Sequence, residues 1–211
     1  MINSTGKNAF TTIYVLFLIT GASLLYNFKQ PEMELAINGF NSTYSDYFFK
    51  YITFFGDGIF YTAVCLIICI FDWKKGIVAG FIGAFQGLIV QGLKYFVFAE
   101  APRPMHTFEV NPPNITPHLV DGVQVHAFGS FPSGHTATAF ALAICIIFVF
   151  TSHKPLLSLL LFLTAALVGY SRIYLLQHFF IDVYMGSIIG VFTSISIWNI
   201  ANKHWFGILE E

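Results

Sequence analysis

The chain has 211 residues, of which 56% are hydrophobic and 10% are charged, and its mean hydropathy is +0.70. Soluble globular domains carry about 25% charged residues, so this composition excludes an ordinary soluble domain and indicates one integral membrane domain over residues 1–211. The formal net charge is −1 and the chain has no run of lysine and arginine, which excludes nucleic acid as a partner. The expected surroundings are the lipid bilayer.

Six apolar segments have the length needed to cross a hydrocarbon core, which takes roughly 17 to 25 helical residues. Backbone polar groups cannot stay unpaired in lipid, so these segments are expected to be helices and the fold class is expected to be all-α. We expect transmembrane helices over residues 10–27, 51–71, 76–98, 134–151, 156–176 and 179–201. The result would be a bundle of six helices with a polar outer loop over residues 99–131.

Three features of the connecting segments each allow two interpretations. Residues 31–50 mix apolar, aromatic and polar side chains, which suits a helix in the membrane interface and equally a plain loop. Asp57, near the outer end of the second segment, either steadies a cation of a site or faces water at a helix end. Residues 120–123, Val-Asp-Gly-Val, are typical of a hairpin turn lying over a site, or of an ordinary connection.

Neither the cysteines nor the loop histidines predict a metal site. The three cysteines fall inside apolar segments, where cysteine behaves as a small hydrophobic residue: Cys65, Cys69 and Cys145. The loop histidines are spaced by 12 and 8 residues, which matches no compact zinc pattern: His106, His118 and His126. We therefore expect neither a metal nor a disulfide framework.

Two short motifs lie on either side of a nearly uncharged stretch. The first is Pro-Ser-Gly-His at residues 132–135, and the second is Ser171-Arg172 followed by His178 and Asp182. The stretch between them holds two apolar segments separated by polar residues 152–155, so the chain is expected to cross the membrane and return. Both motifs then reach the same membrane face and are expected to form one site.

Three cations are expected on that face: Lys94, Arg103 and Arg172. A phosphoryl group in transfer spreads negative charge over three oxygens, which positioned cations stabilise. The arginine fork matches phosphate oxygens, and lysine adds a point charge. The first turn of the helix after Pro132 would add unpaired backbone N–H groups. These belong to Ser133, Gly134 and His135.

The two histidines suit different steps of phosphoryl transfer. His178 and Asp182 are four residues apart and therefore share one helix face, so the carboxylate can hold one ring N–H and leave the other nitrogen as a nucleophile. His135 is then placed to protonate the leaving group and later to accept a proton from water. The pattern predicts hydrolysis through a phosphohistidine.

These residues resemble the type 2 phosphatidic acid phosphatase (PAP2) superfamily, which includes membrane lipid phosphatases. The resemblance rests on Lys94, Arg103-Pro104 and the two motifs, in that order. It implies a metal-independent phosphatase without a cofactor, with His178 as nucleophile, Asp182 as its partner and His135 as acid and base. It also implies a phosphate cradle: Lys94, Arg103, Ser133, Gly134 and Arg172. The family usually has six residues between its lysine and Arg-Pro, whereas eight, residues 95–102, intervene here.

A site at helix ends beside the hydrocarbon favours a substrate whose tail stays in the bilayer. The expected function is hydrolysis of a lipid phosphate or diphosphate, and the resemblance suggests undecaprenyl diphosphate, phosphatidylglycerol phosphate, phosphatidic acid or the phosphates of lipid A. Two alternatives are phosphotransfer to another lipid and a non-catalytic lipid-phosphate binder or transporter. The His178–Asp182 pair argues against the binder, because binding alone needs no oriented nucleophile.

The orientation prediction comes from the lysines and arginines in alternate connections. They divide five against five, and five against two once Lys94, Arg103 and Arg172 are set aside as site residues. This places both termini in the cytoplasm and the site at the periplasmic face of a bacterial inner membrane. Nothing in the sequence indicates the oligomeric state.

Overall fold

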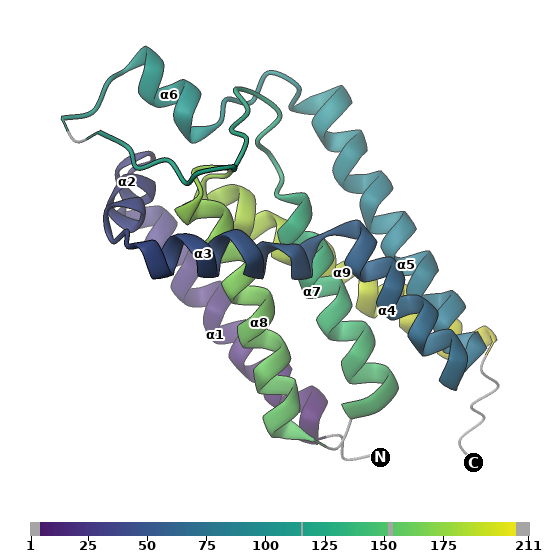
Figure 1. Ribbon diagram of the computed structural model, residues 1–211. Coiled ribbons are helices and arrows are strands. Elements are labelled where there is room, and N and C mark those ends of the chain that lie inside the picture. The colour runs from purple at the N-terminus through teal and green to yellow at the C-terminus, as the bar shows by residue number, and fades with distance from the viewer. Residues whose placement is uncertain (1–4, 115, 152–153, 206–211) are drawn as a thin grey trace.

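The computed structural model describes residues 5–114, 116–151 and 154–205, so that two residues of the expected polar turn, 152 and 153, lie outside it. The described residues form helices and connections without a strand, which confirms the all-α class (Figure 1). In chain order the helices are α1 (Thr5–Asn27), α2 (Glu32–Gly39), α3 (Thr43–Ile52), η1 (Thr53–Gly56), α4 (Gly58–Phe71), α5 (Trp73–Gly92), η2 (Leu93–Val97), α6 (Pro104–Val110), α7 (Gly134–Ile146), η3 (Ile147–Thr151), α8 (Pro155–Tyr174) and α9 (Phe180–His204).

Four helices are long and apolar enough to cross a membrane: α1, α5 continued by η2, α8 and α9. A fifth span results if residues 43–56 and α4, which meet at a bend of 52°, count as one. The helix over residues 134–150 is apolar but shorter. The count of six transmembrane helices therefore stays a prediction.

The bend falls at Asp57, inside a segment that the sequence predicts as one helix over residues 51–71. The backbone of Asp57 is extended, and its Oδ1 accepts a hydrogen bond of 2.7 Å from the N–H of Ile59. A carboxylate that accepts such a bond satisfies a free donor of the first turn and starts a new helix. Asp57 is thus the N-cap of α4, which corresponds to the helix-end interpretation.

Helix α7 lies at the centre of the bundle, with α1 and α8 on one side and α4 and α5 on the other (Figure 1). Phe140 of α7 packs against Tyr14 of α1 and Phe162 of α8. On its other side, Cys145 lies among apolar residues that include Ile82 of α5. Burial of these side chains fixes the helix that carries the first motif.

Helices α7 and α9 meet backbone to backbone. A Cβ added to Gly186 would lie 2.5 Å from the carbonyl oxygen of Ser133, and one added to Gly190 would lie 2.3 Å from that of Ala137. Only glycine allows this approach. The N–H of Ser133 also donates to the carbonyl oxygen of Asp182 at 3.0 Å, so the two motifs are joined directly.

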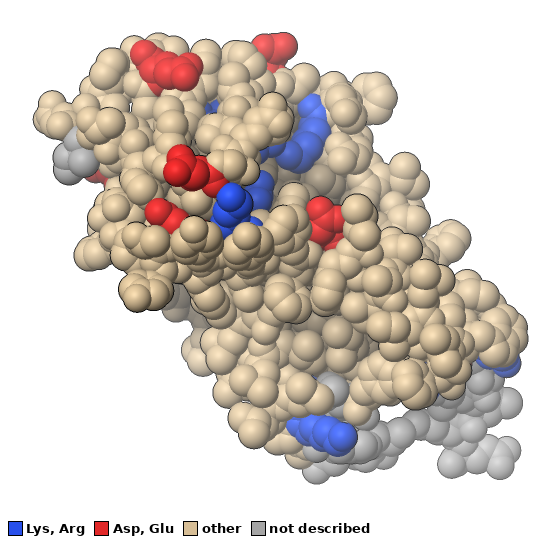
Figure 2. All heavy atoms as spheres, viewed as in Figure 1, with Lys and Arg blue, Asp and Glu red and all other residues tan. Residues whose placement is uncertain are grey.

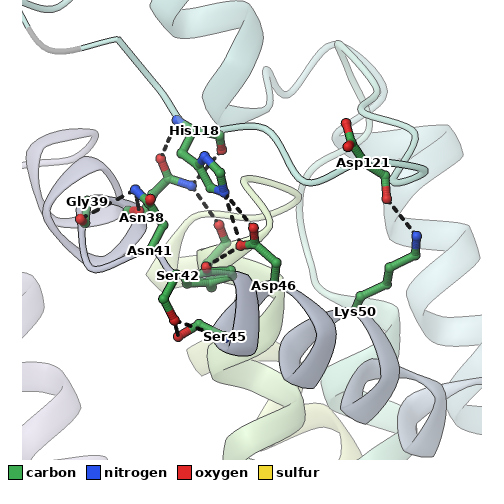
Figure 3. A network of polar contacts seen from close by, with 10 residues as sticks. Asn38, Gly39, Asn41, Ser42, Ser45, Asp46, Lys50, His118 and Asp121 are labelled. Carbon is green, nitrogen blue, oxygen red and sulfur yellow. Dashed lines mark hydrogen bonds and ion pairs between the residues drawn. The ribbon is translucent and has the colours of Figure 1, made fainter.

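Residues 31–50 form helices α2 and α3 rather than a plain loop, and they fasten the 99–131 segment over one end of the bundle (Figure 3). Asn38 donates to the carbonyl oxygens of His118 and Tyr174, both at 2.9 Å, and accepts the N–H of His118 at 2.8 Å. The His118 ring contacts both carboxylate oxygens of Asp46 at 3.0 Å. His118 therefore holds the 99–131 segment against α2 and α3.

Residues 120–123, which the sequence leaves open as a hairpin turn or an ordinary connection, form a turn without flanking strands among the described residues. The N–H of Val123 donates to the carbonyl oxygen of Val120 at 3.1 Å, and Gly122 adopts φ +72°, a conformation that glycine accepts without strain. Lys50 of α3 donates to the carbonyl oxygen of Asp121 at 2.6 Å (Figure 3). The turn thus holds the loop against α3.

Candidate active site

The two motifs open into one cavity of about 820 Å³, at the end of the bundle where α7 begins and α8 ends. Figure 2 shows Lys and Arg atoms set back between tan surfaces in the upper part of this face. Six of the eight predicted site residues line the cavity: Lys94, Arg103, Gly134, His135, Arg172 and His178. Ser133 and Asp182 do not line it and are buried directly behind it.

Asp182 holds His178 through one carboxylate oxygen that has three donors. Its Oδ2 lies 3.3 Å from Nδ1 of His178 and accepts the N–H of Phe179 at 2.9 Å and the hydroxyl of Ser130. Burial, together with the nearby Arg103, lowers the pKa of His178 well below its usual range. The ring is therefore neutral near pH 7, the form in which an imidazole nitrogen has a lone pair for attack.

Arg103 and Lys94 share an acceptor on the wall of the cavity. Arg103 donates from Nε to the carbonyl oxygen of Phe128 at 2.9 Å, from Nη1 to that of Gln177 at 2.7 Å and from Nη2 to that of Gly129 at 3.3 Å. Lys94 donates to the same Gly129 oxygen at 2.8 Å. Carbonyl oxygens orient both cations without neutralising their charges, and burial lowers the pKa of Arg103.

Arg172 reaches the cavity from the end of α8. Its Nη1 donates to the hydroxyl of Thr53 at 2.8 Å, while its Nε is buried and has no partner among the described residues. Arg172 lines the cavity, so its guanidinium can offer remaining donors to an anion there. Arg172 is thus a prepared anion-binding side chain.

His135 lies at the start of α7 against the 3₁₀ turn η1. A Cβ at Gly56 would lie 2.5 Å from the carbonyl oxygen of His135, so the glycine lets η1 pack directly on this residue. His135 and His178 line the same cavity, as the proposed division of proton transfer and attack requires.

Ser133 corrects one detail of the expected cradle. Its N–H is not an unpaired donor, because it binds the carbonyl oxygen of Asp182, and its hydroxyl lies 2.9 Å from that of Thr136. The side chain is fully buried. Ser133 therefore joins the two motifs, and the donors left for an anion at this helix start are those of Gly134 and His135.

Comparisons with known proteins give the family of this chain. Residues 75–206 match the family described as the PAP2 superfamily. This chain belongs to the PAP2 superfamily. It is 31% identical over 179 residues to lipid A 4'-phosphatase of Bacteroides thetaiotaomicron, an alignment that covers 82% of this chain and 76% of that protein.

Two further proteins extend the comparison of this PAP2 protein. Over 132 residues it is 33% identical to undecaprenyl-diphosphatase BcrC of Bacillus subtilis, covering 61% of each chain. The crystal structure of Aquifex aeolicus LpxE superimposes with a TM-score of 0.68 at 28% identity, covering 83% of this chain and 98% of that one. The PAP2 protein is a lipid phosphatase and an integral membrane protein.

The longer spacing between Lys94 and Arg103 in this PAP2 protein is accommodated by local structure. The chain passes through the π-helical turn η2, where the N–H of Phe98 donates to the carbonyl oxygen of Leu93, and then through a tight turn closed by Ala101. The two cations still reach the same Gly129 oxygen. The two additional residues do not separate them.

Sequence reasoning missed four residues that shape the site. Three hold other site residues: Ser130 binds Asp182, Thr53 binds Arg172 and Gln177 binds Arg103. The fourth, Lys50, lines the cavity, as Thr53 and Gln177 also do. Ser130 and Gln177 each lie next to a motif, two residues before Pro132 and one before His178, and this proximity was the available signal. Thr53 and Lys50 carry no such signal.

Proposed function

We propose that this protein hydrolyses a lipid phosphate or diphosphate through a phosphohistidine at His178. The observation that carries the proposal is one cavity in which a carboxylate-held histidine faces the same space as three cations and a second histidine. A phosphoryl group needs these partners for attack, charge stabilisation and proton transfer. The comparison with named lipid phosphatases supports the same reaction.

The first step forms a bond from Nε2 of His178 to phosphorus and breaks the bond to the leaving oxygen. His135 donates a proton to that oxygen, so a lipid alcohol departs uncharged and a lipid phosphate departs with its leaving oxygen protonated. Asp182 stabilises the positive charge that develops on the His178 ring. Lys94, Arg103 and Arg172, with the N–H groups of Gly134 and His135, bind the phosphoryl oxygens.

In the second step His135 accepts a proton from water while the water oxygen attacks phosphorus. The phosphorus–nitrogen bond breaks, inorganic phosphate is released and His178 returns to its neutral form. No metal is part of this sequence of steps, because side-chain cations and backbone donors carry the charge. Among the described residues, no group of three or more His, Cys, Asp and Glu side chains is arranged to hold a metal ion.

We further propose that residues 1–211 form one domain with six spans, counting residues 43–71 and 134–151 as one span each, in a bacterial inner membrane. The start of α1 and the end of α9 lie at the end of the bundle away from the cavity (Figure 1). The site then faces the periplasm and both termini the cytoplasm. A cysteine introduced at Asp121 should react with an impermeant maleimide in intact cells, whereas one at Lys75 should not.

The test of function measures phosphate release by purified protein in detergent from lipid A, undecaprenyl diphosphate, phosphatidylglycerol phosphate and phosphatidic acid. His178→Ala is expected to abolish release from every substrate that the unaltered protein hydrolyses, with the thermal unfolding midpoint retained. Vanadate should compete with substrate, and a chelator should not inhibit. Turnover by His178→Ala at the unaltered rate would refute the nucleophile assignment, and labelled phosphate in the lipid fraction would indicate transfer instead.

A further inference from the structure

Lys50 lines the cavity from α3, although neither motif includes it. Its Nζ donates to the backbone carbonyl of Asp121 at 2.6 Å, while the Asp121 carboxylate points away from it (Figure 3). Lys50 forms no ion pair with another residue in the part of the chain that the structure describes. A fourth cation therefore faces the cavity without a protein carboxylate to neutralise it.

A hydrogen bond fixes the position of the Lys50 ammonium. Gly122 provides the room, since a Cβ at that position would lie 2.8 Å from Nζ. One helical turn earlier, Asp46 fastens the same face of α3 to His118 and to the hydroxyl of Tyr174. Ordering a lysine side chain on binding costs entropy. Lys50 is already ordered by its hydrogen bond, so binding a ligand costs less additional entropy.

Lys50 is bound at a different point of the loop from Lys94 and Arg103. Lys94 and Arg103 meet at the carbonyl oxygen of Gly129, whereas Lys50 is bound at Asp121, eight residues earlier on the loop that lines the cavity. Gln124 and His126, between those two points, also line it. The volume of about 820 Å³ is in the range of sites for drug-sized molecules and exceeds the needs of one phosphate group.

We infer that Lys50, with Gln124 and His126, forms an outer subsite for a second anionic group of the lipid head. The inference rests on the proposed function, because it takes the reacting phosphate to be bound at His178. It names the preferred substrate class: a lipid with a second phosphate or phosphodiester attached to, or a few bonds from, the phosphate that is removed. Lys50 is then a residue for substrate selection and takes no part in the chemical steps.

The experiment compares lipids that differ in one negative group but share their tails. Phosphatidylglycerol phosphate is paired with phosphatidic acid, and dodecyl diphosphate with dodecyl phosphate. Lys50→Met keeps the apolar stem and removes the charge. We expect a rise of about 10-fold in KM for the lipid with two anionic groups in at least one pair, a change in kcat below about 2-fold, and little effect on its partner. The pair in which KM rises indicates how far the second anionic group lies from the phosphate that is removed.

Two control variants make the result specific. Lys50→Arg keeps the charge and is expected to retain the unaltered preference. Lys29→Met removes a lysine that is exposed and outside the cavity, and should change nothing. Equal losses for both members of each pair, an unchanged KM in Lys50→Met, or hydrolysis of singly anionic lipids alone by the unaltered protein would overturn the outer subsite. Absence of phosphate release from all four lipids, from lipid A and from undecaprenyl diphosphate would instead contradict the proposed function. Release from lipid A alone would leave the proposed function intact and overturn the substrate class, because the two phosphates of lipid A are many bonds apart.

Discussion

Replacing Ser130 by alanine tests whether the hydrogen bond from Ser130 to the Asp182 carboxylate is needed for His178 to react. The Ser130 hydroxyl, the N–H of Phe179 and the ring of His178 all bind the same oxygen, Oδ2. The His178 contact is the longest, at 3.3 Å, so the other two donors set the orientation of the carboxylate. Ser130→Ala removes one of them and lets the carboxylate rotate away from the ring.

The size of the effect follows from the type of hydrogen bond. A bond to a charged group contributes about 1.5 to 3 kcal/mol, and about 1.4 kcal/mol corresponds to ten-fold in rate. Ser130 is 1% exposed, so water cannot take the place of the hydroxyl without displacing neighbours. Because the Phe179 N–H remains, we expect the lower part of this range, a fall in kcat of roughly 10- to 30-fold with KM nearly unchanged.

The assay is phosphate release in detergent over a range of substrate concentrations, with thermal unfolding measured in parallel. Ser194→Ala is the matched control, because Ser194 is also fully buried and its hydroxyl donates to the carbonyl oxygen of Gly190 at 2.7 Å, outside the cavity. It should lower stability without changing kcat. A kcat within two-fold of the unaltered protein in Ser130→Ala, or a loss confined to KM, would refute the reasoning.

Three further predictions concern pH and packing. Because burial lowers the pKa of His178, its nucleophilic form persists below pH 6.5, so the acid limb of kcat/KM should lie below that value; an acid limb at or above pH 6.5 would contradict this. Burial raises the pKa of Glu34, so its contribution to stability is full below the unfolded pKa of about 4.3 and is lost as pH rises through the folded pKa. Relative to Glu34→Gln, the unaltered protein should lose stability in denaturant titrations as pH increases from about 4 to 7, and parallel curves would be the contrary result. Gly186→Ala places a methyl group 2.5 Å from the carbonyl oxygen of Ser133 and should lower both the unfolding midpoint and kcat, whereas Gly80→Ala, at a helical glycine with open space, should lower neither.

The all-α class was predictable because apolar segments of spanning length leave helix as the only way to pair the backbone in lipid. The break at Asp57 was missed, since hydrophobicity continues on both sides of it. Its local signal was an aspartate directly before a helix-forming run, the usual N-cap pattern. The number of spans depends on how this bend lies in a bilayer, which hydrophobicity does not determine.

The motif residues were predictable as a group because each of them has a chemical reason to be polar beside a membrane. Ser130, Gln177 and Thr53 were not, because their importance comes only from which side chain the fold places next to them. The same holds for Ser133, whose N–H is taken by α9 rather than left for a ligand. These contacts join residues 49 to 119 positions apart, so a position next to a motif does not give the partner of Ser130 or Gln177.

The backbone contact between α7 and α9 places His135, the proposed proton donor, and His178, the proposed nucleophile, in one stiff unit. A lipid head of varying bulk must therefore be admitted by movement elsewhere, in α2, α3 and the loop fastened through Asn38, His118 and Asp46. Binding of the lipid head group and release of product then depend on these polar contacts, which lie away from the reacting phosphorus. A compound that immobilised this cover would stop turnover without touching any reacting atom.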